Sequence, residues 1–147
     1  MTRDVLLSLK GLQYDFGEES EEVETITPAQ YYHRDGNHYI VYDEVQEDLM
    51  TPIKNCIMFR DDYLEVKKNG AINVNMIFEE KKKNISNYAT PFGELVIGVD
   101  TGKISMTEED SRIRLQVDYQ LDINYVHLAD CKISVDVRDI SSGLSLS

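Results

Sequence analysis

The sequence has no tryptophan, and it has only 2 cysteines and 3 prolines in 147 residues. Cys56 and Cys131 are too few and too far apart for a zinc-binding spacing or a disulfide framework, so we expect two buried thiols in a reducing compartment. No stretch approaches the roughly 20 apolar residues that a membrane-spanning helix requires. These absences argue against a small disulfide-rich domain and against a helical membrane protein.

Basic residues are also scarce, with 15 Lys and Arg against 27 Asp and Glu and a net charge of -12. This excess of negative charge repels phosphate backbones and anionic lipid surfaces. We therefore expect neither a nucleic acid nor a membrane as partner. A neutral small molecule or another protein is compatible with the charge.

The first ten residues contain an apolar stretch too short for a secretory signal, and Asp4 and Lys10 interrupt or bound it. The alternation of Val5, Leu7 and Leu9 predicts a strand instead. We therefore expect a cytoplasmic protein.

Strict alternation of apolar and polar residues is what the sequence has in abundance. From residue 112 to 123 every odd position is apolar and every even position is polar, and the pattern resumes from 131 to 137. Successive side chains of a strand point to opposite faces of a sheet, so this pattern predicts a long antiparallel hairpin with one buried face. Its predicted inward residues are Ile113, Leu115, Val117, Tyr119, Leu121, Ile133 and Val135.

The rest of the chain contains short strand-like segments and turn signals, with no helical periodicity. Asp35-Gly36 and Asn69-Gly70 predict tight hairpin turns. Pro28 predicts that its strand lies at a sheet edge or carries a bulge. The predicted strands cover residues 5–12, 23–32, 38–44, 53–60, 63–68, 71–79, 84–90, 95–99, 103–107, 112–123 and 131–137.

This pattern indicates an all-β protein with one domain over residues 1–140 and a loose tail over 141–147. A succession of hairpins favours a meandering antiparallel β-barrel of roughly 8–11 strands over a sandwich. Closing the sheet into a barrel also removes exposed strand edges.

Two groups of residues are candidate sites of chemistry. Asp100-Thr101-Gly102 matches the aspartic protease signature, but that enzyme needs two carboxylates, and we interpret the motif as a hairpin turn. His33 and His38 flank the Asp35-Gly36 turn and can face each other across the hairpin. A metal site would need a third ligand, which His127 or Asp35 could supply, and we interpret the three histidines as surface or turn residues. We expect no metal, no cofactor and no enzymatic activity, because no catalytic constellation is complete.

Tyrosine is unusually frequent, with nine residues. Tyr42, Tyr88 and Tyr119 lie in the most strand-like segments. An aromatic ring with a polar tip that points into a barrel suits a small-ligand pocket, and it equally suits an ordinary core in which the hydroxyl bonds a backbone carbonyl. Both interpretations stay open.

Several segments resemble, in order and spacing, the YwiB-like family of small bacterial proteins of unknown function. They are Lys68-Asn69-Gly70-Ala71, Met76-Ile77-Phe78, Tyr88-Ala89-Thr90-Pro91-Phe92-Gly93-Glu94-Leu95 and Tyr119-Gln120-Leu121. The family is similar to the calycins, the superfamily of lipocalins and fatty-acid-binding proteins. The resemblance implies a calycin-like barrel and implies no activity.

The Tyr-x-x-Pro-Phe-Gly element also has a physical interpretation. Pro91 forces Thr90 into an extended conformation and stops ladder pairing, while Gly93 permits a backbone angle or a close approach that other residues resist. We predict a structural corner at Pro91 and Gly93. The alternative is a ligand contact at the barrel mouth that involves Thr90 and Phe92.

Two functions are compatible with these observations. The first is a non-enzymatic barrel that binds a small, mostly apolar molecule in its interior, in contact with Tyr42, Tyr88, Thr90, Phe92 and Tyr119. The alternative is a protein-interaction or regulatory module, such as a homodimer, with a filled barrel and no ligand.

Overall fold

The computed structural model describes residues 3–11, 24–45, 50–70, 73–90 and 93–140, with the backbone alone at 88–90. These residues form ten strands and no helix, so none of them belongs to a helix that crosses a membrane. The strands are β1 Asp4–Lys10, β2 Glu24–Arg34, β3 Asn37–Glu44, β4 Ile53–Arg60, β5 Tyr63–Asn69, β6 Val74–Glu79, β7 Lys82–Thr90, β8 Gly93–Glu108, β9 Arg112–Ile123 and β10 Val126–Asp139.

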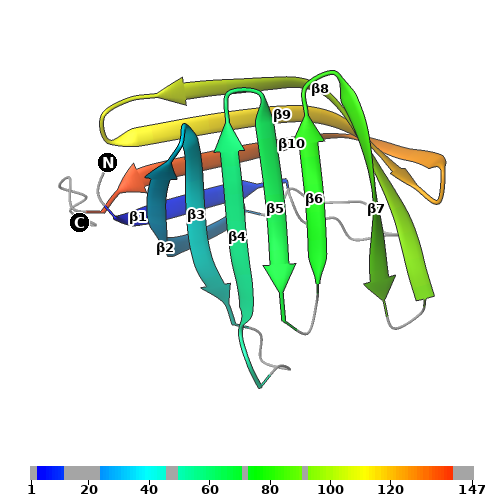
Figure 1. The fold of residues 1–147 in the computed structure, drawn as a ribbon, viewed down its shortest axis with the longest axis horizontal. Helices are drawn as coiled ribbons and strands as arrows, with labels where there is room; N and C mark the ends of the chain where they lie inside the picture. The colour runs from blue at the N-terminus through cyan, green and yellow to red at the C-terminus, as the bar shows by residue number, and fades with distance from the viewer. Residues whose placement is uncertain (1–2, 12–23, 46–49, 71–72, 91–92, 141–147) are drawn as a thin grey trace.

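All ten strands belong to one antiparallel sheet in the order β6-β5-β4-β3-β2-β1-β10-β9-β8-β7. The sheet curls into a nearly closed barrel, in which strands β3 to β6 cross over strands β8, β9, β10 and β1 (Figure 1). The two end strands, β6 and β7, meet at a seam. There the Ser86 hydroxyl donates a hydrogen bond of 2.9 Å to the carbonyl oxygen of Asn75. The predicted meandering barrel is confirmed.

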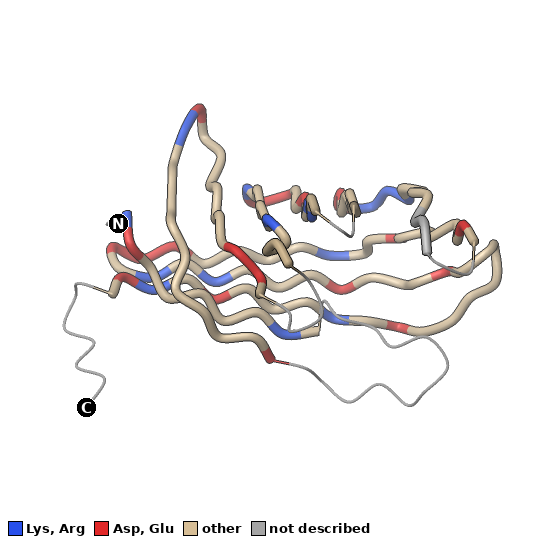
Figure 2. The backbone as a smooth tube through the Cα atoms, turned by 90° about the horizontal axis from the view of Figure 1, so that it is seen from below, with Lys and Arg blue, Asp and Glu red and all other residues tan. Residues whose placement is uncertain are grey.

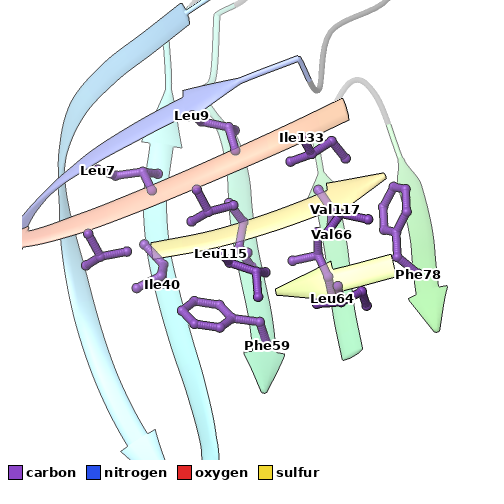
Figure 3. Close-up of a cluster of buried hydrophobic side chains, with 14 of the residues drawn as sticks. Leu7, Leu9, Ile40, Phe59, Leu64, Val66, Phe78, Leu115, Val117 and Ile133 are labelled. Atoms are coloured by element: carbon purple, nitrogen blue, oxygen red, sulfur yellow. The ribbon is translucent and has the colours of Figure 1, made fainter. Parts of the chain in front are cut away.

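The alternating pattern of β9 places its odd residues in the core, as predicted. Leu115 and Val117 are 2% and 0% exposed, and they face Phe59 and Phe78 from the crossing layer, both 0% exposed (Figure 3). Burying each such side chain contributes about 1.5–3 kcal/mol of transfer free energy. Large side chains therefore fill the middle of the barrel.

The predicted hairpin turn at Asp35-Gly36 is confirmed. Asp35 and Gly36 have φ angles of 53° and 80°, as a tight type I′ turn requires.

Pro28 lies in the part of β2 that pairs with β1 alone among the described strands, because pairing between β2 and β3 begins at Gln30. This segment is locally an edge, which suits a residue that has no N–H to donate.

Two strand predictions are wrong. The segments predicted as separate strands at 95–99 and 103–107 are one strand, β8, which pairs with β7 in its first half and with β9 from Ile97 onward. The strand predicted to begin at residue 71 begins at Val74, because Asn69 still pairs with Lys54 and the tight Asn-Gly turn does not form there. Residues 141–147, the predicted tail, lie outside the described residues.

Candidate functional site

Two of the predicted ligand-binding residues, Tyr42 and Tyr119, face the barrel interior. Tyr42 lies on β3 and is 8% exposed, and Tyr119 lies on β9 and is 5% exposed. The two tyrosines lie on different strands and have no cross-strand partner in common. Tyr42 pairs with Asn55, whereas Tyr119 pairs with Thr101 on one side and Cys131 on the other.

The other predicted residues lie at the hairpin between β7 and β8. The backbones of Tyr88 and Thr90 pair with Leu95 and Gly93. The side chains of Tyr88 and Thr90, and the whole of Pro91 and Phe92, lie outside the described residues. Gly93 has a φ of 124°, and apart from its chain neighbours no described residue has an atom within 4 Å of where a Cβ would be, so it supplies a backbone angle. The predicted ligand contacts here stay predictions.

Three polar residues meet on the interior face of β7, β8 and β9, and we call Asn84, Thr101 and Tyr119 the β7–β9 corner. Thr101 of β8 pairs with Tyr119 of β9. Asn84 of β7 pairs with Val99, two residues before Thr101 on β8, so Asn84 is a diagonal neighbour of Thr101 on the same face of the sheet. Thr101 is 0% exposed. Its hydroxyl and the buried Nδ2 atom of Asn84 have no hydrogen-bond partner in the described part of the chain. Buried polar atoms normally have a partner, so this corner is the strongest candidate site.

A β-bulge directly follows Thr101, which faces the interior in phase with Ile97 and Val99. The register of β8 against β9 shifts between Thr101 and Lys103, which leaves Gly102 as the extra residue. The Asp-Thr-Gly motif is therefore a bulge, and its interpretation as a hairpin turn is wrong. A bulge bends its strand, and this one lies where the pairing of β8 with β7 ends while its pairing with β9 continues. Asp100 points outward and is exposed.

Tyr119 contacts residues of two other strands. Its ring lies edge-on to Phe78 of β6, with ring centres 5.0 Å apart and planes inclined by 70°. Cys131 of β10 is paired with it and is a free, half-buried thiol. Burial raises the pKa of Cys131, and a hydrogen bond with Tyr119 opposes that shift. Cys56 is also a free, half-buried thiol, so both cysteines are less buried than predicted.

A second polar group surrounds Tyr42 at the end of β3. Lys68 Nζ lies 2.9 Å from Glu44 Oε1, and the amide of Asn55 donates to the same carboxylate oxygen at 3.3 Å. Asn55 is 1% exposed, and its Oδ1 atom has no partner in the described residues. Burial, and then the charge of Glu44, raises the pKa of Tyr42 to about 12, so its phenol stays protonated.

A third polar group occupies the interior near the β2–β3 turn. The rings of His33 and His38 stack with centres 4.6 Å apart, which confirms that they face each other. His38 is 3% exposed, and its Nε2 lies 3.7 Å from Glu108 Oε1. Burial raises the pKa of Tyr31, which bonds His38, to about 12, with smaller contributions from Glu108 and Asp139.

The described residues do not place a third metal ligand beside the stacked histidines. Among the described residues, no group of three or more His, Cys, Asp or Glu side chains is placed to hold an ion. His127 lies elsewhere, on β10, within 3.8 Å of Asp122 and 3.6 Å of Asp130.

Sequence reasoning missed the β7–β9 corner apart from Tyr119. One signal could have located its bulge. Buried residues of β8 fall on odd positions at Ile97 and Val99 and on an even position at Ile104. A change of phase within an alternating segment indicates one inserted residue.

Comparison with known proteins agrees with this fold. The uncharacterized β-barrel protein YwiB of Bacillus subtilis (strain 168) is 25% identical over 134 residues, which cover 90% of this chain and 92% of that protein. The crystal structure of the YwiB protein from Bacillus subtilis superimposes with a TM-score of 0.73 at 22% identity, over 92% of this chain and 91% of that one.

The family model described as a domain of unknown function, DUF1934, matches residues 7–135. That range extends from the first strand to the last and includes Asn84, Thr101 and Tyr119. The resemblance predicted from the sequence is confirmed: this chain is a member of the DUF1934 family, the family of YwiB-like β-barrel proteins.

Proposed function

We propose that this protein binds a small, mostly apolar molecule inside the barrel at the β7–β9 corner, and that it acts by binding and not by catalysis. The observation that supports this proposal most directly is the pair of unpartnered polar atoms, Thr101 Oγ1 and Asn84 Nδ2. A buried polar atom without a partner costs about 1–3 kcal/mol. A ligand atom that bonds both groups removes that cost, and the ligand gains affinity.

The surroundings of the corner define the chemistry of the ligand. Val99 and Leu121, two residues along their strands from Thr101 and Tyr119, are 2% and 3% exposed and offer apolar contacts. The Asn84 amide donates a hydrogen bond, and the Thr101 hydroxyl donates or accepts one. A molecule with an apolar body and one carbonyl, carboxyl or hydroxyl group meets both requirements. This is the kind of ligand expected for a calycin-like barrel.

The ligand occupies one side of the interior because Phe59, Leu64 and Leu115 fill the middle. The route of entry is the seam between β6 and β7, which are neighbours in the chain yet are not paired in the sheet. The hydrogen bond from Ser86 to the backbone of Asn75 is the contact that must open there.

Native mass spectrometry tests the proposal on protein purified without denaturation from its natural host. We expect an added mass of a few hundred daltons on the 16.9 kDa chain. Thr101→Val keeps the shape of the side chain and removes the hydroxyl, so the affinity for the bound molecule should fall about three- to tenfold, the equivalent of one hydrogen bond.

Thr107→Val is the matched control, because Thr107 lies on the same strand and is exposed. It should leave the bound mass unchanged. A wild-type protein without added mass would contradict a ligand at this corner. The same holds if both substitutions lower the fraction of protein that carries the added mass by the same amount. An ordered water that bonds Thr101 and Asn84 would give that result.

A further inference from the structure

The outer face of the β2–β3 hairpin is apolar where a barrel surface is normally polar. Ile26, Tyr32 and Val41 point away from the interior and are 58%, 38% and 37% exposed. The outward positions of β9, from Arg112 to Asp122, all carry charged or amide side chains. Exposed aromatic and aliphatic side chains gathered on one surface indicate an interface.

Two arginines border this surface. The guanidinium of Arg3 lies 5.0 Å from the centre of the Tyr32 ring and donates a hydrogen bond of 2.8 Å to its phenol oxygen. Arg3, Tyr32, Arg34 and Val41 help to line a shallow hollow of about 780 Å³. Among the described residues, neither arginine has a carboxylate within 4.0 Å. Within this part of the chain, both cations can therefore meet a carboxylate from a second chain.

A carboxylate lies on the same surface at its other end. Asp43 is outward and exposed near the end of β3, and among the described residues it has no cation within 4.0 Å. Arg34 pairs with Asn37 at the start of β3, six residues away, or about 20 Å along an extended strand. Figure 2 shows the hairpin rising clear of the two layers, with a basic segment near its tip and an acidic segment where β3 ends.

We propose that the outer face of the β2–β3 hairpin binds the same face of a second copy of this chain, with Arg34 of each copy against Asp43 of the other. Arg34 lies at one end of this face, and Asp43, which pairs with the exposed Lys54 of β4, lies at the other, with apolar side chains between them. A twofold axis in the interface, across the strands, brings unlike ends together and buries Val41 against the second copy. Such self-complementarity is what a symmetric dimer requires. The interior site uses different residues, so this interface does not depend on a ligand.

Sedimentation velocity of the purified full chain tests the interface with charge-swapped variants. We expect the wild type to sediment as a species with twice the chain mass of 16.9 kDa. Arg34→Glu and Asp43→Arg should each raise the dimer dissociation constant about tenfold or more, because each places like charges together. The double variant Arg34→Glu/Asp43→Arg should restore the dimer to within about threefold of the wild type.

The two single variants also separate a specific contact from general repulsion between acidic chains. Arg34→Glu makes the net charge more negative and Asp43→Arg makes it less negative, so general repulsion would move their dissociation constants in opposite directions. Lys103→Glu, an exposed change on β8, is the control and should leave the dimer intact. A monomeric wild type, a dimer that both single variants leave intact, or a double variant that is not restored overturns the proposal.

Discussion

The phenol oxygen of Tyr31 and Nδ1 of His38 lie 2.7 Å apart in a hydrogen bond inside the barrel. Glu108 near the opposite ring nitrogen favours a proton on Nε2, so that Tyr31 donates to Nδ1. Burial is the main reason that the pKa of His38 is lowered, the charge of Glu108 opposes the shift and that of His33 adds to it. The fold therefore holds His38 in its neutral form.

Acid should destabilise the protein through His38. The unfolded chain binds a proton at this residue below about pH 6.5, whereas the folded chain binds it only at lower pH. The free energy of unfolding should therefore fall as the pH drops through about 6.5 and level off below the lowered pKa of the folded state.

Urea titrations across this pH range measure the effect. His38→Gln keeps an acceptor for Tyr31 but cannot be protonated, so it should reduce the fall. His127→Gln on the exposed side of β10 should retain it. A wild-type curve without this acid-side fall would show that His38 is not held neutral.

Thr101→Val should stabilise the ligand-free protein. The buried hydroxyl has no partner among the described residues, so replacing it with a methyl group removes an uncompensated desolvation cost of about 1–3 kcal/mol. Thermal unfolding of ligand-free protein should show a higher midpoint for Thr101→Val and little change for Thr107→Val. A lower midpoint would mean that the hydroxyl is already satisfied, for example by water.

Gly11 and Gly36 have the same φ of 80° but different surroundings, which makes them a matched pair. A Cβ on Gly11 would lie 2.0 Å from the carbonyl oxygen of Lys132, whereas no atom lies within 4 Å of one on Gly36. Gly36→Ala should cost about 1–2 kcal/mol from the backbone angle alone, and Gly11→Ala should cost more because the backbone must also move. Equal losses in chemical denaturation would contradict the close contact at Gly11.

Gly93→Val should lower the free energy of unfolding by clearly more than the typical 1 kcal/mol of a point substitution. The reason is the φ of 124° at Gly93, which a β-branched residue resists. Glu94→Val, at the exposed neighbouring position, introduces the same side chain without that angle and should cost less. An unchanged melting temperature for Gly93→Val would refute the structural corner that the sequence predicts at Pro91 and Gly93.

Local sequence patterns were sufficient to predict most of the barrel. The alternation in β9 and the turn at Asp35-Gly36 determine strands and register through neighbouring residues, so the pairing of His33 with His38 followed from them. Asp100-Thr101-Gly102 misled because turns and bulges favour the same small residues. The pairing of Asn69 with Lys54, which delays β6, depends on a strand distant in sequence.

The candidate site was less predictable than the fold. Tyr119 was identifiable because an inward tyrosine interrupts an aliphatic pattern. Asn84 and Thr101 are ordinary polar residues in the sequence, and their significance comes from burial without partners. That condition depends on the register of three strands and on the bulge at Gly102.

The most direct test of ligand binding is a high-resolution crystal structure of the protein purified without denaturation. We predict continuous density for an organic molecule within hydrogen-bond distance of Thr101 Oγ1 and Asn84 Nδ2, with its apolar part against Val99 and Leu121. Density for isolated waters alone, bonded to these two atoms, would contradict a ligand at the β7–β9 corner.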